Sequence, residues 1–346
     1  MKYKGEPDYK HGSRDRLGVL LTNLGTPENP SPVSLKKYLK EFLSDPRVIE
    51  VPRIIWQIIL RGFILNTRPK KVAKLYKSIW LKKGSPLLVT LKSQTKKIKK
   101  KIGRKLGDTR FELAMRYGDP SIESGLAALN RQGCRRILIL PLYPQYCAAT
   151  TGSTFDKVTK ILRGWRWIPE VRFVNGYFDH PMYINALCES IKTNWKTKGR
   201  LEKIIFSYHG VPKKYLLKGD PYHCFCQKTT RLVVEKLKLK EKEYMTTFQS
   251  RFGPDEWLQP YTDKTLESLP AKGVKKIHII SPGFSSDCLE TLEELEKENK
   301  EIFLGAGGLE YNYIPCLNES PNHINLLSEL IINHTKGWPE NKKKNG

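Results

Sequence analysis

Short apolar runs of β-strand character alternate along this chain with longer segments that suit helices. Segments 32–43 and 181–196 are examples of the second kind, and each separates two runs of the first kind. The alternation predicts an α/β chain with parallel strands, because parallel neighbours need a crossover connection that is usually a helix. With 346 residues, the chain is expected to form two domains. The predicted strands are 17–24, 111–116, 136–142, 170–175, 203–207, 244–249, 276–281 and 301–304.

A weak internal repeat sharpens this prediction. Segments 18–27 and 204–212 are both apolar strands that end in Gly-x-Pro, and segment 136–143 resembles segment 276–284. The repeat predicts two similar α/β halves that face each other across a cleft. In open α/β sheets, ligands bind outside the carboxyl ends of the strands, so functional residues are expected there.

The chain is strongly basic. Its 61 Lys and Arg outnumber 35 Asp and Glu, for a formal net charge of +26. This excess favours anionic partners, but no nucleic-acid-binding motif is present, so no nucleic acid partner is expected. The apolar runs are too short to span a membrane, and the first residues lack the core of a signal peptide, which predicts a cytoplasmic protein. Seven irregularly spaced cysteines fit a reducing compartment.

One apolar stretch, from Ile54 to Leu65, has two interpretations. Apolar residues lie nearly all round it, which suits either a buried core helix or a helix at a membrane interface. Its basic flanks, Arg61, Arg68 and Lys70, are typical of contact with anionic lipid. The sequence leaves both interpretations open.

His209 and Glu290 each follow a predicted strand. A His at a strand end, just before Gly210, can act as a base near neutral pH or as a metal ligand. Asp287 and Glu290 match a helix capping box, which would make Glu290 structural. Glu290 and Glu294, however, begin a series of carboxylates at spacing four, which repel one another unless a cation is near. A metal or proton site and a solvated acidic helix both remain open.

Two further motifs carry less weight. The segment His223-Cys224-Phe225-Cys226 lacks a second ligand pair, so it is a weak metal motif. Neither the glycine-rich segment 305–308 nor the hydroxyl-rich segment 143–153 matches a nucleotide fingerprint, so no nucleotide cofactor is indicated.

Taken together, several segments resemble the ferrochelatase family, in order and along nearly the whole chain. The ordered set is far more specific than any one segment. The set consists of Asn23-Leu24-Gly25-Thr26-Pro27, Arg116-Tyr117-Gly118, Tyr143-Pro144-Gln145-Tyr146, Thr150-Thr151-Gly152-Ser153, Ser207-Tyr208-His209-Gly210-Val211-Pro212, Gly219-Asp220-Pro221-Tyr222, Trp257-Leu258-Gln259-Pro260 and segment 282–292.

The resemblance implies two similar Rossmann-like domains whose parallel four-stranded sheets face a porphyrin cleft. The first domain would cover 1–176, with a C-terminal helix at 320–336 packing back on it, and the second would cover 177–319. The implied activity is insertion of Fe(II) into protoporphyrin IX, the last step of haem biosynthesis, which gives protohaem and releases two protons. A chelatase for coproporphyrin or another tetrapyrrole, and a non-catalytic haem or metal carrier on the same fold, are the alternatives.

The resemblance also implies roles for single residues. His209 matches the family's active-site histidine and Glu290 its paired glutamate, so both are expected to act in catalysis and at the metal. Glu294 and Glu298 would form a relay on the same helix. The stretch from Ile54 to Leu65 matches a lip that contacts lipid in membrane-associated members, which implies peripheral contact with an anionic membrane. The substrate-binding positions would be Leu24, Arg116, Tyr117, Tyr143, Trp257 and Phe284.

Two positions depart from the family pattern. Cys288 stands where many relatives have His, which leaves its part in a metal relay open. Some relatives hold a [2Fe–2S] cluster through C-terminal cysteines and one cysteine after the Tyr-Pro-Gln-Tyr segment. Here that position is Ala148, with Cys147 one residue early, and the last residues contain no Cys. Because a cluster needs four ligands, no iron–sulfur cluster and no other cofactor is expected.

Overall fold

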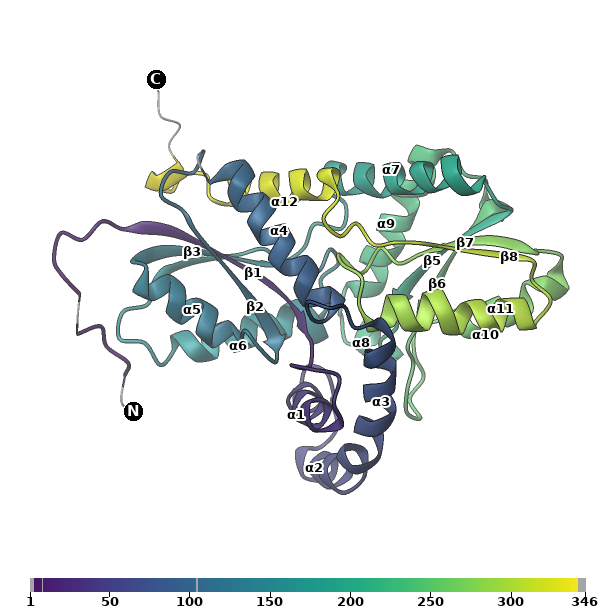
Figure 1. Ribbon diagram of the computed structural model, residues 1–346, viewed down its shortest axis with the longest axis horizontal. Helices are drawn as coiled ribbons and strands as arrows, with labels where there is room; N and C mark the ends of the chain where they lie inside the picture. Colours follow the sequence, from purple (N-terminus) through teal and green to yellow (C-terminus); the bar gives the residue numbers. More distant parts are fainter. Residues whose placement is uncertain (1–2, 8, 104, 342–346) are drawn as a thin grey trace. The chain divides into compact units, whose positions relative to one another are not determined.

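The computed structural model describes residues 3–7, 9–103 and 105–341. It contains two four-stranded sheets of parallel strands flanked by helices (Figure 1). The chain divides into two compact units. The first unit comprises Met1–Leu142, Ala148–Asn175 and Ile324–Gly346, and the second comprises Tyr143–Cys147 and Gly176–His323. The sequence-based division places 1–176 and the helix at 320–336 in the first domain and 177–319 in the second, whereas in the structure the short segment Tyr143–Cys147 groups with the second unit.

In the first unit, the strand order is β2-β1-β3-β4. β1 lies in the middle and pairs in parallel with β2 and β3, while β4 pairs with β3 at the edge. The strands are β1 (Arg16–Gly25), β2 (Arg110–Tyr117), β3 (Cys134–Pro141) and β4 (Glu170–Phe173).

Serine caps begin several helices of this unit. Ser31, Ser85 and Ser121 each accept a hydrogen bond from the backbone N–H three residues on, which satisfies a donor that the first helical turn leaves unpaired. The helices are α1 (Pro32–Leu43), α2 (Arg53–Ile59), η1 (Leu60–Ile64), α3 (Leu65–Ile79), α4 (Pro86–Ile102), α5 (Ile122–Arg131), η2 (Ala148–Gly152), α6 (Ser153–Leu162), α12 (Pro321–His334) and η6 (Pro339–Asn341).

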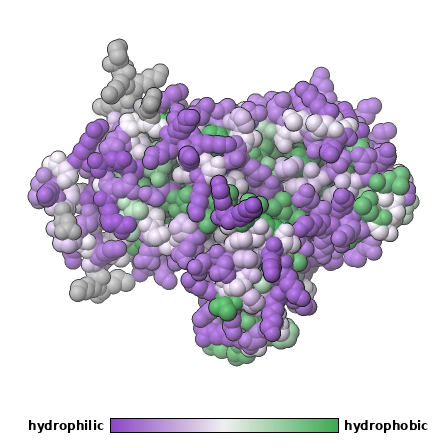
Figure 2. Space-filling view, viewed as in Figure 1, coloured by the Kyte–Doolittle hydropathy of each residue, from purple (hydrophilic) through white to green (hydrophobic). Residues whose placement is uncertain are grey.

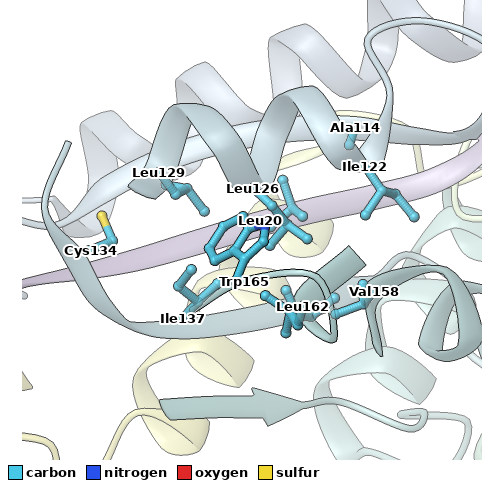
Figure 3. Packing of buried hydrophobic residues seen from close by; sticks show 11 residues of the cluster. Leu20, Ala114, Ile122, Leu126, Leu129, Cys134, Ile137, Val158, Leu162 and Trp165 are labelled. Carbon is cyan, nitrogen blue, oxygen red and sulfur yellow. The ribbon is translucent and has the colours of Figure 1, made fainter. Parts of the chain in front are cut away.

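Helices α5 and α6 bury an apolar cluster against one face of this sheet (Figure 3). Leu20 and Ile137 from the strands meet Leu126 from α5 and Leu162 from α6, all of them buried. A Cβ at Gly125 would lie 2.7 Å from Leu20 Cδ1, so the glycine lets α5 approach β1 closely. The packing fixes the carboxyl ends of β1 and β2, which carry Leu24, Arg116 and Tyr117.

The second unit repeats the same topology. Its strand order is β6-β5-β7-β8, which is the order of the first sheet with each strand number raised by four, and all three pairings are parallel. The predicted internal repeat and the predicted pair of parallel four-stranded sheets are therefore confirmed. The strands are β5 (Lys203–His209), β6 (Tyr244–Gln249), β7 (Lys276–Ile280) and β8 (Glu310–Ile314).

The core of the second unit lies between this sheet and the helices that follow β6 and β7. Ile205 and Ile279 from the strands pack with Leu266, Leu295 and Phe303 from the helices. The helices of the unit are α7 (Pro181–Lys198), α8 (Lys213–Leu217), α9 (Tyr222–Leu237), η3 (Glu241–Glu243), α10 (Thr262–Ser268), η4 (Pro270–Lys272), η5 (Glu290–Glu298) and α11 (Asn299–Gly305).

One predicted strand, 301–304, is wrong. Those residues lie in helix α11, and the eighth strand, β8, comes after them. The apolar pair Ile302-Phe303 is the buried side of a helix rather than a strand. The chain then turns back over Phe303 at Gly308, where a Cβ would lie 2.3 Å from the ring. A four-residue apolar run does not distinguish these cases by pattern alone.

The apolar stretch of α2 and η1 is not a core helix. Ile54, Ile58 and Phe63 are 81%, 68% and 66% exposed, whereas Trp56 and Leu60 from the other side of the stretch are buried. Figure 2 shows hydrophobic surface gathered over α2, at the lower end of the view. The core-helix interpretation is therefore wrong for this face, and the stretch presents apolar side chains to its surroundings. None of the helices described is both long enough and apolar enough to cross a bilayer.

Candidate active site

His209 is the last residue of β5 and is half-buried. Its Nδ1 atom lies 2.6 Å from the carbonyl oxygen of Gly210. A carbonyl oxygen only accepts hydrogen bonds, so Nδ1 carries a hydrogen, and in the neutral form of the ring the lone pair is on Nε2. The tautomer that this contact selects is the one that can take up a proton, or bind a metal, through Nε2.

Gly210 lets two other chain segments approach the histidine. A Cβ at this position would lie 2.9 Å from the carbonyl oxygen of Gln249 and 3.1 Å from Trp257 Cε3. Leu258 N–H donates to Val211 O at 3.0 Å, which ties the tryptophan segment to the turn that follows the histidine. The predicted pocket residue Trp257 thus packs against Gly210, the residue that follows His209.

Phe284 is the second predicted aromatic residue near His209. Its ring centroid lies 6.3 Å from that of the imidazole, with 56° between the planes. Phe284 follows β7 and is half-buried, in a turn closed by its N–H donating to Ser281 O at 3.3 Å. Phe284 follows β7 and Trp257 follows β6, so both aromatic residues come from the carboxyl ends of strands that neighbour β5, where ligand sites in open sheets are expected.

Glu290 begins a nine-residue π-helix, η5, rather than an α-helix. Longer π-helices are rare, and π-bulges are frequent at functional sites.

The capping-box interpretation is wrong, because no side chain caps this helix and Leu289 is its N-cap. The carboxylate of Asp287 instead accepts hydrogen bonds from Tyr313 OH at 2.6 Å, from Asn318 Nδ2 at 2.6 Å and from Cys316 N at 3.2 Å.

Glu294 is the carboxylate that the structure places in the electrostatic field of His209. It accepts a hydrogen bond from Ser250 N–H at 2.8 Å, one from the Ser250 hydroxyl, and one from Gln249 Nε2 at 3.2 Å. Burial raises the pKa of Glu294, against the Ser250 hydrogen bond and the positive field of His209, which both lower it.

Glu290 and Glu298 are placed differently. Glu290 is half-buried at the first turn of η5, and its backbone carbonyl accepts a hydrogen bond from Gln249 Nε2 at 2.9 Å. Within the described part of the chain, no hydrogen bond or ion pair joins its carboxylate to His209. Glu298 is exposed at the end of η5. The three predicted carboxylates thus run from a half-buried end to an exposed end of one helix.

Metal-ligand groups of three or more are absent from residues 3–7, 9–103 and 105–341, counting His, Cys, Asp and Glu. The weak His-Cys-x-Cys motif therefore forms no such group. On α9, Cys224 is exposed while Cys226 is fully buried. Cys288 is also buried, and burial raises the pKa of its thiol, which disfavours the thiolate that binds metals.

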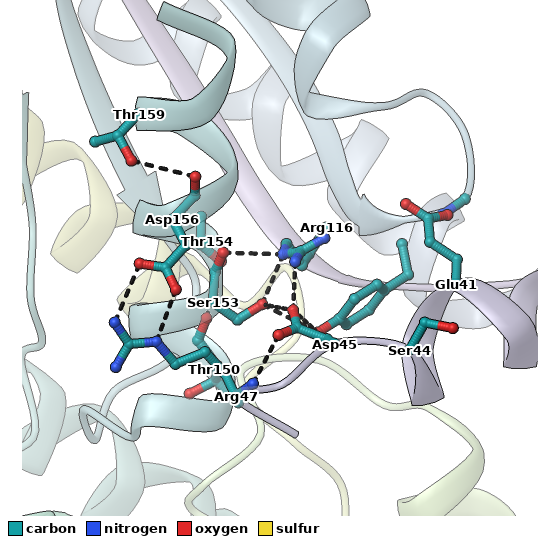
Figure 4. Close-up of polar contacts among 12 residues, drawn as sticks. Glu41, Ser44, Asp45, Arg47, Arg116, Thr150, Ser153, Thr154, Asp156 and Thr159 are labelled. Atoms are coloured by element: carbon teal, nitrogen blue, oxygen red, sulfur yellow. Dashed lines mark hydrogen bonds and ion pairs between the residues drawn. The ribbon is translucent and has the colours of Figure 1, made fainter. Parts of the chain in front are cut away.

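In the first unit, Arg116 and Tyr117 belong to a polar network around Asp45 (Figure 4). Arg116 forms an ion pair with Asp45 and donates from Nε to Ser153 Oγ at 2.6 Å. Tyr117 OH donates to Asp45 Oδ2 at 2.9 Å, and Ser153 Oγ donates to the same oxygen at 2.6 Å. The Arg116 side chain is 11% exposed and Tyr117 is fully buried, so both are committed to this network.

The network keeps Asp45 ionised. Burial alone would raise the pKa of this carboxyl, but hydrogen bonds from Ser153 and the Arg47 backbone, with the charge of Arg116, hold the pKa below its usual value. Burial raises the pKa of the Tyr117 phenol. A charged pair this well satisfied fixes the carboxyl end of β2 to the start of α6.

Leu24 and Tyr143 complete the predicted pocket residues. Leu24 is half-buried near the end of β1, where its N–H donates to Asn23 Oδ1 at 2.8 Å. Tyr143 is buried and follows β3, in the segment that groups with the second unit. Both lie at the carboxyl ends of strands.

Comparison with known proteins agrees with this arrangement. A family model described as Ferrochelatase matches residues 16–335. The chain belongs to the ferrochelatase family. It is 54% identical over 341 residues to a ferrochelatase from Thioalkalivibrio sulfidiphilus, a match that covers 98% of this chain and 92% of the relative. It is also 54% identical over 344 residues to a ferrochelatase from Marinobacter nauticus, covering 99% and 93% of the two chains.

A solved structure shares the fold of this ferrochelatase-family chain. The sirohydrochlorin chelatase SirB from Bacillus subtilis subspecies spizizenii, in complex with cobalt, is similar with a TM-score of 0.55 at 11% identity, over 95% of this chain and 98% of the other. At this identity the similarity shows the fold alone. The predicted resemblance and the two-domain chelatase fold are confirmed.

Four polar residues of these networks escaped the sequence reasoning: Asp45, Ser153, Gln249 and Ser250. Gln249 ends a correctly predicted strand and Ser250 follows it, so their position at a carboxyl edge was a usable signal. Ser153 belongs to the segment Thr150-Thr151-Gly152-Ser153, which carries the family resemblance, but the resemblance implies no role for it. Asp45 gives no local signal, because its ion-pair partner Arg116 is 71 residues away in the sequence.

Proposed function

We propose that His209 is the base of the metal-insertion reaction and that Glu290, Glu294 and Glu298 take up its protons. Membership of the ferrochelatase family makes this chain an enzyme of haem biosynthesis, which inserts iron into protoporphyrin. The observation that supports the residue roles is the hydrogen bond from Nδ1 of His209 to Gly210 O, with the buried Glu294 in the field of the ring.

The chemistry requires a base at the ring centre. Free-base protoporphyrin IX holds two pyrrole N–H protons, and Fe(II) displaces both as the product forms. A neutral imidazole is a suitable acceptor near neutral pH, and Nε2 of His209 is the atom left to accept. A nearby carboxylate stabilises the resulting imidazolium and can receive the proton, which returns His209 to its neutral form.

The carboxylates of η5 would form a path along which the released protons move from His209 to solvent. Glu294 is held among three hydrogen bonds, and Glu298 at the far end of the helix is exposed. A proton passed from His209 toward the exposed end of this helix reaches solvent. We assign Glu290 to the metal together with His209. The remaining ligands of Fe(II) during transfer would be water and the pyrrole nitrogens.

The macrocycle would contact the aromatic and apolar residues at the strand ends. Phe284 lies near the His209 ring and Trp257 packs against Gly210, so the two aromatic side chains favour one orientation of a planar ligand. A rigid wall of this kind binds a distorted porphyrin better than a flat one, which lowers the barrier to metal entry. Leu24, Arg116, Tyr117 and Tyr143 are further proposed contacts, and Arg116 and Tyr117 would act from within the Asp45 network.

The exposed face of α2 and η1 would rest on an anionic membrane from the cytoplasmic side. Ile54, Ile58 and Phe63 supply apolar area. Between Glu50 and Asp108, the sequence contains 17 Lys and Arg and no acidic residue. Apolar burial and attraction to anionic lipid together produce peripheral, reversible binding.

The enzyme would work without a resident cofactor, because Ala148 replaces the internal cluster cysteine and Fe(II) is a substrate. Anaerobic incubation of the purified protein with Fe(II) and either protoporphyrin or coproporphyrin, followed by absorbance, tests the function. The expected result is conversion of protoporphyrin to protohaem. Conversion of coproporphyrin but not of protoporphyrin would contradict the assignment of protoporphyrin as the substrate. Porphyrin binding without conversion would indicate a carrier.

A further inference from the structure

Gln249 connects the strand that carries His209 with the helix that carries the carboxylates. It is the last residue of β6, and in the parallel pairing of β5 with β6 it lies opposite His209. Its side chain is 3% exposed. A buried amide must have its donors and acceptor satisfied, so the partners of this side chain show what it holds in place.

Both ends of the amide are used. Nε2 donates to Glu290 O at 2.9 Å and to Glu294 Oε2 at 3.2 Å, and Oε1 accepts from the Ser207 hydroxyl at 2.8 Å. The Glu290 carbonyl and the Glu294 carboxylate can only accept hydrogen bonds, so the amide nitrogen of Gln249 must face them. In the flipped amide, Oε1 would face these two oxygens, and no hydrogen would lie between them. Ser207, two residues before His209, therefore holds the amide in its working orientation.

Gln249 also makes a hydrogen bond to the backbone of η5. A carbonyl oxygen can accept two hydrogen bonds, and Gln249 Nε2 donates to the carbonyl of Glu290 in the first turn of this helix. Tyr311 OH donates to Leu295 O at 2.5 Å further along the same helix. Side chains from neighbouring strands thus stabilise the helical form that presents the carboxylates.

We propose that Gln249, hydrogen-bonded to Ser207, is a positioning residue that fixes the Glu294 carboxylate and the backbone of Glu290 relative to His209. This inference rests on the proposed roles of His209 and the η5 carboxylates. It adds two residues to the site, neither of which would touch the porphyrin or the metal.

The titratable groups around Glu294 come from three elements. His209 faces it from β5, Glu290 lies on its own helix, and Tyr311 approaches from β8. Ser250 and Gln249 are neutral donors. Removal of the Gln249 donor would disfavour the carboxylate and raise the pKa of Glu294, since hydrogen bonds to the charged form stabilise it. If Glu294 must be ionised to receive a proton, the acidic limb of the rate profile moves to higher pH.

The test is the pH dependence of kcat for anaerobic Fe(II) insertion by Gln249→Met, which keeps the side-chain length and removes both donors. The acidic limb is expected to move up by about one pH unit, with porphyrin affinity unchanged. Ser207→Ala, which keeps the glutamine but frees its amide, should give a smaller shift in the same direction. Gln94→Met, at a fully buried glutamine of α4, is the control and should leave the limb in place.

An unmoved acidic limb in both Gln249→Met and Ser207→Ala would overturn the proposal, even if kcat falls with the folded fraction. If Gln249→Met does not fold, Ser207→Ala decides by the same criterion. Failure of the proposed roles is distinguishable, because His209→Ala would then insert iron at a near-wild-type rate.

Discussion

Single hydrogen bonds decide where protons and charges lie in this protein. One contact to a backbone carbonyl sets the tautomer of His209, and three donors hold Glu294 against the cost of its burial. In the first unit, Asp45 satisfies Arg116, Tyr117 and Ser153 at once. Substitutions of single polar atoms should therefore separate catalytic effects from effects on stability.

Glu290→Gln should reduce the rate of iron insertion with little change in stability. The residue caps no helix in this structure, so the free energy of unfolding should change by less than about 0.5 kcal/mol. Loss of a group that moves protons or holds metal should lower kcat by about 10²–10⁴-fold. Glu296→Gln, at an exposed carboxylate of the same helix, should leave both quantities unchanged. A stability loss with retained turnover would show instead that Glu290 is structural.

Asp45→Asn should destabilise the protein, because it leaves the guanidinium of Arg116 buried without a counter-charge. The side chains of Asp45 and Arg116 are 5% and 11% exposed, and breaking such a pair costs about 3 kcal/mol. Asp156→Asn, which breaks the Arg47 pair with both side chains above 40% exposed, should cost less than about 1 kcal/mol. Urea unfolding measures the free energy of unfolding of both variants. An equal loss of stability in the two variants would contradict the inference that the Asp45 network is buried.

The Asp45 contribution also has a definite pH dependence. The pKa of Asp45 is lower in the folded than in the unfolded protein, so the carboxylate stabilises the fold fully above the unfolded value near 3.8. That stabilisation is lost as the pH falls through the folded pKa. The gap between wild type and Asp45→Asn should thus be constant near neutrality and narrow in acid; a gap that widens in acid would contradict the assignment.

At the scale of elements, the strands were more predictable than the helices around the site. Gly-x-Pro turns after apolar runs located the ends of β1 and β5, and with them His209. The π-helix was not predictable, because its form depends on donors such as Gln249 and Tyr311 from distant strands. The Asp287 capping box failed for the same reason, since Tyr313 and Asn318 occupy that carboxylate. Sequence spacing predicts hydrogen bonds between residues that are near in the sequence, and it does not predict bonds to distant strands.

The α2 and η1 segment supports a prediction at the same scale. Replacement of Ile58, Ile59 and Phe63 by Ser should abolish the part of anionic-vesicle binding that survives high salt, because these side chains are 68%, 41% and 66% exposed and salt does not screen apolar burial. Binding at low salt should weaken but persist through the basic residues, each worth roughly 1 kcal/mol near the surface.

The matched control for this prediction is Leu217→Ser with Leu309→Ser, at exposed apolar residues of the second unit. It should bind vesicles as the wild type does. Sedimentation with vesicles at low and high salt measures both variants. No binding of the wild type at low salt, or unfolding of the triple variant, would contradict the membrane assignment.

Across the whole molecule, two units repeat one topology but carry different chemistry. The strand orders β2-β1-β3-β4 and β6-β5-β7-β8 correspond strand by strand, so β1 and β5 are equivalent. β5 ends in His209, where the equivalent region of β1 carries Leu24 and no ionisable group. The exposed apolar segment of α2 and η1 occurs in the first unit and the acidic π-helix in the second. The fold is thus duplicated, while the proposed proton chemistry is confined to one unit.

The most direct test of the central claim is a single-turnover measurement with His209→Ala under anaerobic conditions. Porphyrin binding is followed by fluorescence, and Fe(II) insertion is followed by absorbance in the same sample. We expect porphyrin affinity within about twofold of wild type, because the imidazole acts on the ring centre, and an insertion rate lower by about 10²–10⁴-fold. Insertion at a near-wild-type rate with normal porphyrin binding would contradict the assignment of His209 as the base.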